Sequence, residues 1–142
     1  MEKNTRGFTL IELLVVISII SLLSSIVMST LSAAKDKGSD TKSIQTVIQT
    51  RNALQMYFAD NGNYPATLSE LTTPKTYIST IDPAVKYEVV GNNNYHMAII
   101  LKQAMGVLSS DADTNTTLIK GNSTDCAGAN TGTDLCYDVT AQ

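Results

Sequence analysis

Glu12 is the residue of this 142-residue chain with the most unusual chemical surroundings. It stands at the start of a long apolar run, because the stretch from Leu13 to Leu31 holds no charged residue, no proline and no glycine. A carboxylate costs roughly 2.5–3.5 kcal/mol at the centre of a membrane-inserted helix, and less near the interface. No cation lies within one helical turn of Glu12. We therefore expect its positive partner to come from elsewhere.

Catalytic chemistry has little support in the sequence. The single histidine, His96, has no nucleophile or second histidine at a useful spacing, which favours an ordinary strand residue over a ligand. No glycine-rich phosphate loop is present, and no carboxylate pair stands out from ordinary surface charge. We expect no enzymatic activity and no cofactor.

The pattern Asp111-x-Asp113-x-Asn115 begins like a calcium-binding loop. Such loops need glycine at the sixth position and glutamate at the twelfth, where this chain has Thr116 and Asn122. A solvated loop is therefore favoured over a metal site. Asp111 and Asp113 are the candidate calcium ligands of the alternative.

The apolar run is long enough to span a membrane. Residues 13–31 extend about 28 Å as a helix, close to the hydrocarbon thickness of a bilayer. A buried helix in a chain of this length is usually shorter and amphipathic. We expect one domain plus this anchor.

The first residues carry a resemblance to a known family. Lys3, Arg6 and Gly7, followed by the stretch Phe8-Thr9-Leu10-Ile11-Glu12, resemble the amino-terminal signal of type IV pilins and type II secretion pseudopilins. The alternative is an ordinary signal anchor with a stray glutamate.

The resemblance implies a role for three residues. A prepilin peptidase would cut after Gly7 and methylate the new terminal amine of Phe8. Glu12 would then pair with the terminal amine of a neighbouring subunit in a filament. Methylation preserves the charge of the amine, and a charge pair is stronger in an apolar bundle than in water.

Serines recur in the apolar run at intervals of 3, 4, 4 and 3, which puts them on one helix face. These are Ser18, Ser21, Ser25, Ser29 and Ser32. Small side chains let helices approach closely in lipid, so a packing stripe in a filament core is favoured over mere tolerance of serine.

The fold class that we expect is α+β, with a long amino-terminal helix packed on a small antiparallel sheet, as in pilins. The helix should run from about Phe8 to Asn61, where Asn61-Gly62-Asn63 ends it. Many pilins have a proline midway, but this chain has none before Pro65, so we expect a continuous helix that is weakest at Gly38.

The predicted organisation has three parts. Residues 1–7 are the leader, residues 8–34 the transmembrane or filament-core helix, and residues 35–142 an extracytoplasmic globular domain. That domain includes the amphipathic helix 35–61 and a sheet, whose predicted strands are residues 87–90, 95–101 and 137–139.

The two cysteines, Cys126 and Cys136, lie close together in the sequence. In a chain exported across a membrane, such a pair favours a disulfide over two reduced thiols. It would close the carboxyl-terminal loop. Zinc is disfavoured, because two cysteines and a distant histidine cannot fill a tetrahedral site.

The net charge argues against a nucleic-acid surface. Removal of Lys3, Arg6 and Glu2 with the leader changes 10 basic and 13 acidic residues to 8 and 12. A mildly acidic chain lacks the clustered lysines and arginines that nucleic acids require.

Three functions remain, of which the first is favoured: a subunit of a type IV pilus, a type II secretion pseudopilin, and an anchored binding domain that does not polymerise. The cysteine-closed loop resembles pilins more than major pseudopilins, which tend to have a calcium loop and no disulfide. The resemblance implies a homo-oligomeric helical filament, a prepilin peptidase, an inner-membrane assembly platform and, before assembly, membrane lipid as partners. The precursor would cross the inner membrane once, and the filament would be periplasmic or extracellular.

Overall fold

The computed structural model describes residues 7–91, 93–103, 106–109, 111–121, 123, 125–128 and 134–141, without the side chain of Ser29. Of the predicted leader, residues 1–6 lie outside the described residues, as does Asn122 of the calcium-like pattern. The chain divides into two compact units, Met1–Asp36 and Lys37–Gln142. The expected boundary was between residues 34 and 35.

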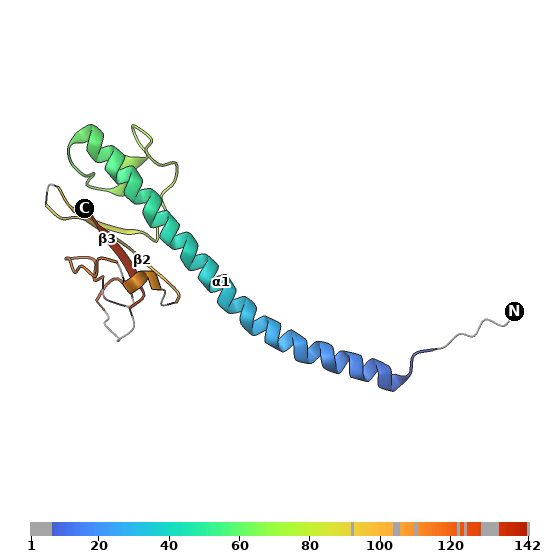
Figure 1. Ribbon diagram of the computed structural model, residues 1–142. Helices are drawn as coiled ribbons and strands as arrows, with labels where there is room; N and C mark the ends of the chain where they lie inside the picture. Colours follow the sequence, from blue (N-terminus) through green and yellow to red (C-terminus); the bar gives the residue numbers. More distant parts are fainter. Residues whose placement is uncertain are drawn as a thin grey trace. The chain divides into compact units, whose positions relative to one another are not determined.

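One long helix, α1, spans Leu10–Asn61 (Figure 1). It is continuous through Gly38, as the absence of proline predicts. Gly62 follows the helix with a φ of 75° and donates its N–H to the Phe58 carbonyl at 2.8 Å. A positive φ is readily adopted by glycine, so the predicted helix end is confirmed.

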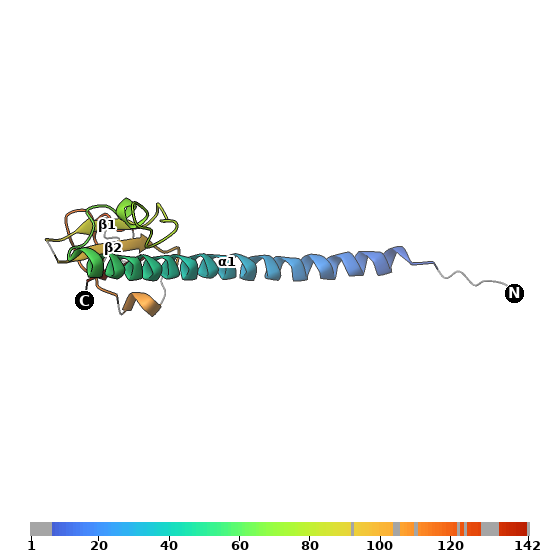
Figure 2. The ribbon, with the colours of Figure 1, turned by 90° about the horizontal axis from the view of Figure 1, so that it is seen from above.

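Three strands form an antiparallel sheet in the order β1-β2-β3. They are β1 Lys86–Val89, β2 Tyr95–Ile100 and β3 Cys136–Thr140, close to the predicted ranges. In Figure 2, β1 and β2 lie along the last turns of α1. The predicted α+β fold is therefore confirmed.

Two short 3₁₀ helices complete the described elements. The first, η1 Leu68–Leu71, begins with a capping box between Thr67 and Glu70. The second, η2 Gly106–Ser109, follows β2, so the chain bends there instead of continuing as a strand.

The main core lies between α1 and one face of the sheet. Alternate residues of β2 point to this face, because successive side chains in a strand alternate sides. The core contains Val47 and Leu54 from α1 and Tyr95, Met97 and Ile99 from β2, all at most 2% exposed. This burial accounts for the amphipathic half of α1.

The described residues of the segment 111–128, here called the covering segment, lie on the other face of the sheet. A second, smaller core forms there from Ala98 of β2, Cys136 of β3, and Ile119 and Cys126 of the covering segment. The carboxyl-terminal loop is therefore a second layer on the sheet and has buried residues of its own.

Candidate functional sites

The Gly7–Phe8 peptide bond precedes the first turn of α1. Gly7, Phe8 and Thr9 have no regular secondary structure, and the Phe8 side chain is 86% exposed. No atom lies within 4 Å of the position that a Cβ on Gly7 would occupy. Exposed, irregular backbone is accessible to proteases. The placement is compatible with cleavage at this bond, which stays a prediction.

Glu12 closes a capping box with Thr9 at the start of α1. Its Oε2 accepts hydrogen bonds from the backbone N–H and the hydroxyl of Thr9, each at 2.8 Å. The backbone N–H of Glu12 donates to Thr9 Oγ1 at 3.3 Å. The box satisfies N–H groups that a helix start leaves unpaired, but it supplies no positive charge. The Thr-x-x-Glu spacing is the sequence signal by which this box could have been predicted.

The unit Met1–Asp36 has no core among its described residues. The large apolar side chains from Phe8 to Leu31 are between 46% and 86% exposed. By length and composition, α1 is able to cross a membrane through this stretch. An apolar surface of this size needs a cover, which lipid or further copies of the chain can supply.

The hydroxyls of the serine stripe are bonded within their own helix. Ser18, Ser21 and Ser25 donate to the carbonyls of Leu14, Ile17 and Leu22 at 2.7–2.8 Å. These bonds leave the stripe small and satisfied, which suits close helix packing without bonds between helices. The side chain of Ser29 lies outside the described residues. The role of the five serines in helix packing stays a prediction.

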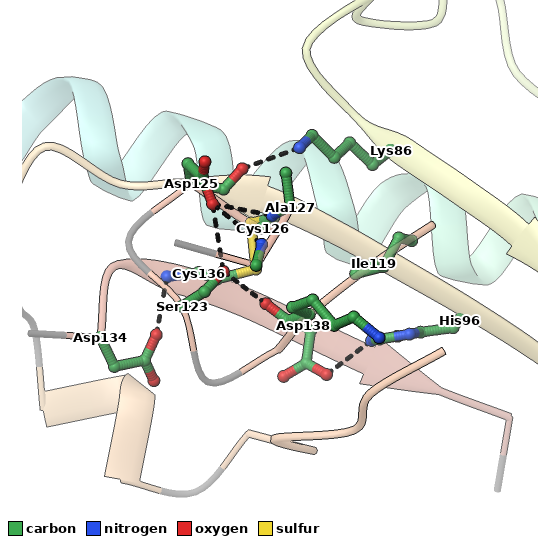
Figure 3. The surroundings of a disulfide bond; sticks show 12 residues. Lys86, His96, Ile119, Ser123, Asp125, Cys126, Ala127, Asp134, Cys136 and Asp138 are labelled. Atoms are coloured by element: carbon green, nitrogen blue, oxygen red, sulfur yellow. Dashed lines mark hydrogen bonds and ion pairs between the residues drawn. A yellow bond between two sulfur atoms is a disulfide. The ribbon is translucent and has the colours of Figure 1, made fainter. Parts of the chain in front are cut away.

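Cys126 and Cys136 form a disulfide, with their Cα atoms 5.1 Å apart and both residues completely buried. Figure 3 shows the bond between the covering segment and the first residue of β3. The disulfide thus holds the covering segment against the sheet at one point.

A second connection joins the same layers. His96 of β2 and Asp138 of β3 are both fully buried, and His96 Nε2 lies 2.6 Å from Asp138 Oδ2 (Figure 3). The other ring nitrogen, Nδ1, is 3.0 Å from Thr116 Oγ1. Asp138 also accepts the backbone N–H groups of Asp113 and Thr114, at 2.9 and 3.0 Å.

This buried pair was missed at the level of the sequence. His96 is a strand residue, as predicted, but its partner is 42 positions away in the chain. Asp138 within a predicted strand was the available signal, because a buried carboxylate needs a partner.

Asp111, Asp113 and Asp138 form a carboxylate cluster in which one oxygen from each lies within 4.8 Å of the others. Both carboxylate oxygens of Asp111 are buried and have no hydrogen-bond partner among the described residues. Burial, followed by the charges of Asp138 and Asp113, raises the pKa of Asp111 to about 7.

The cluster has the chemistry of a site for a hard divalent cation. Carboxylate oxygens are the ligands that Ca²⁺ prefers, and the unpartnered oxygens of Asp111 have the lone pairs to bind it. Asp111, Asp113 and Asp138 would hold the ion, which would offset their mutual repulsion. The structure therefore joins the two predicted candidate ligands to a third, Asp138, that the calcium-like pattern did not include.

Comparisons with known proteins find similarity over part of the chain. Residues 3–28 match the family described as the prokaryotic N-terminal methylation motif. Over 62 residues, the chain is 45% identical to the type II secretion system core protein G of Escherichia coli K12, which covers 44% of this chain and 43% of that protein. The protein of the same name from Klebsiella michiganensis is 38% identical over 86 residues, which are 61% of this chain and 60% of that protein. The type IV wide pilus major component PilA4 of Thermus thermophilus is 36% identical over 69 residues, which are 49% of this chain and 53% of that protein.

Part of the chain is thus similar to type II secretion system core proteins G and to a type IV pilus component. The chain spans about half the length of the curated relatives that it matches. No solved structure was found to match it. The names of these relatives support the pseudopilin alternative better than the pilus subunit that the cysteines favoured.

Proposed function

We propose that this chain is a membrane-anchored subunit of a pseudopilin-type filament of a type II secretion system. The observation that carries the proposal is the uncovered apolar start of α1, which directly follows the methylation motif's Gly7 and Phe8 and includes Glu12. In a membrane, lipid would cover these side chains, and in a filament other copies would replace the lipid.

The amino terminus would supply the missing cation. Cleavage by a prepilin peptidase after Gly7 would create a terminal amine on Phe8, and methylation would keep its charge. The amine of one copy would pair with Glu12 of the next, whose carboxylate is exposed in the single chain. An inner-membrane assembly platform would then move copies from the membrane into the filament.

Variants at Glu12 and Thr9 separate this charge pair from the capping box. Glu12→Gln keeps an oxygen that can accept the Thr9 hydrogen bonds but removes the charge. We expect the variant to insert and to be processed, and filaments to be absent by electron microscopy. Thr9→Ala keeps the charge and removes the hydroxyl, so filaments should form. Normal filaments from Glu12→Gln would contradict the pairing.

Processing and filament type are tested separately. The mature amino-terminal peptide should begin at N-methylated Phe8 by mass spectrometry, and a Gly7 substitution should leave the precursor uncleaved. Short periplasmic filaments fit the proposed pseudopilin. Long surface fibres fit the second candidate, a type IV pilus subunit, which the disulfide favours. Processed protein that never polymerises would fit the anchored binding domain.

A further inference from the structure

A groove of about 680 Å³ is lined in part by β1, one of the two edge strands of the described sheet. Its walls include the carboxylates of Glu70 and Glu88, the rings of Tyr64 and Tyr87, and the exposed side chain of Leu118. None of its described lining residues is a lysine or an arginine. Carboxylates beside tyrosine faces form a site suited to a cationic side chain.

The two carboxylates are fixed in place. Glu70 Oε1 accepts the backbone N–H of Thr67 at 3.0 Å, and Glu88 Oε2 accepts that of Leu118 at 2.9 Å. Hydrogen bonds from the Thr116 side chain and the Leu118 backbone hold the pKa of Glu88 below its ordinary value. His96, the residue opposite Glu88 on β2, is a nearby titratable group, but its ring is bonded to other side chains. A cationic side chain that enters the groove would therefore find the carboxylates of Glu70 and Glu88 already fixed in position.

We propose that this groove binds the lysine-bearing segment of residues 35–42 from a second copy of the chain. The inference rests on the proposed function, since it needs a filament. Lys35, Lys37 and Lys42 are exposed on α1, and none forms a hydrogen bond or ion pair through its side chain with a described residue. The segment also holds Asp36 and Asp40, so its formal charge is three positive against two negative. The Asp40 carboxylate is buried and accepts the backbone N–H groups of Lys102 and Gln103, which leaves the exposed lysines to face the groove's carboxylates.

The length of α1 sets the required displacement. From Lys37 to Tyr57 the helix rises about 30 Å, at 1.5 Å per residue. In a bundle of parallel helices, a copy displaced by this distance brings its lysines level with the end of α1 in the copy below. The groove adjoins that end, because its lining residues Asn63 and Tyr64 follow Asn61 directly.

A photo-crosslinking amino acid at Leu118 tests the contact in assembled filaments of the full chain. Leu118 is 65% exposed on the groove wall, and Ala127, exposed on the disulfide loop, is the control position. We expect the Leu118 probe to capture a peptide that spans residues 35–42 of another copy by mass spectrometry, and the Ala127 probe not to. Capture of any other segment or protein, or no capture, would overturn the inference.

The filament yield of charge variants provides a second measurement. It tests the contact between the groove and residues 35–42 even if the photo-crosslinking amino acid blocks assembly. Glu70→Gln with Glu88→Gln removes both charges and keeps one acceptor oxygen at each position, which is enough for the N–H groups of Thr67 and Leu118. We expect the crosslink and the filament yield to fall at least about fivefold, as loss of about 1 kcal/mol implies. Asp134→Asn, outside the groove and away from the pocket that Lys42 lines, should change neither. Unchanged yield from the double variant would overturn this inference while leaving the filament proposal intact, whereas absence of filaments from the parent chain would remove both.

Discussion

His96 Nε2 lies 2.6 Å from Asp138 Oδ2, and both side chains are completely buried where the covering segment meets the sheet. Asp138 thereby serves three partners, since it also accepts the backbone N–H groups of Asp113 and Thr114. One carboxylate thus joins β2, β3 and the covering segment. It is also a member of the carboxylate cluster with Asp111 and Asp113, so the same residue both attaches the covering segment and belongs to the candidate cation site.

Asp138→Ala should destabilise the protein strongly. It leaves the buried imidazole and two backbone N–H groups without their acceptor, and removing one partner of a buried pair costs about 3–5 kcal/mol. The measurement is thermal unfolding of the detergent-solubilised chain by near-UV circular dichroism of its tyrosines, as the chain has six tyrosines and no tryptophan. Asp60→Ala breaks an exposed ion pair with Lys75, which water and salt screen, and should lower the melting temperature far less. Equal losses in the two variants would refute the role of Asp138.

Gly121→Ala should disturb the same carboxylate by steric contact. An added Cβ would lie 2.5 Å from Asp138 Oδ2 and 2.7 Å from the backbone nitrogen of Thr114. Because the second neighbour is backbone, we expect a loss of about 1–3 kcal/mol, as in overpacked cores. Gly106→Ala is the matched control, since nothing lies within 4 Å of its added Cβ. A melting temperature of Gly121→Ala equal to that of the control would contradict the close packing.

Removal of the disulfide should loosen the other attachment of the covering segment. The two cysteines are 10 positions apart, and closing so short a loop stabilises by roughly 2–3 kcal/mol in the chain-entropy model. Cys126→Ala with Cys136→Ala should therefore lower the melting temperature, with the sheet retained by far-UV circular dichroism. An unchanged melting temperature would show that the hydrogen bonds of Asp138 and the remaining packing of Ile119 and Ala98 hold the segment without the disulfide.

Calcium should stabilise the parent chain through Asp111. At a free concentration of about 100 times Kd, a ligand specific for the folded state adds about 2.7 kcal/mol. Because the pKa of Asp111 is raised to about 7, the carboxylate is ionised at pH 8 at a cost to the folded state. Asp111→Asn should therefore raise the melting temperature at pH 8 in chelator and lose the gain from calcium.

The control for this prediction is Asp60→Asn, which should keep the calcium gain because Asp60 lies outside the carboxylate cluster. Identical melting curves of the parent chain in calcium and in chelator would rule out the cation site at Asp111.

The amino-acid sequence by itself determined the elements. An apolar run without proline is enough to predict an uninterrupted helix, and Gly62 is enough to predict its end, because both depend on local backbone energetics. The strands around Tyr95 and Tyr87 follow equally from local composition. The methylation motif is a contiguous pattern as well, and it is therefore visible without any fold.

The tertiary structure alone decided which distant polar residues meet. Asp40 on α1 is buried and accepts the backbone N–H groups of Lys102 and Gln103, which are more than 60 positions away. The pairing of His96 with Asp138, and the approach of Asp138 to Asp111, depend in the same way on strand register and on the fold of the covering segment. The position of Asp138 in a predicted strand indicates at most that this carboxylate is buried and needs a partner. Which residue is the partner depends on the backbone that brings the two together, and no local pattern identifies it.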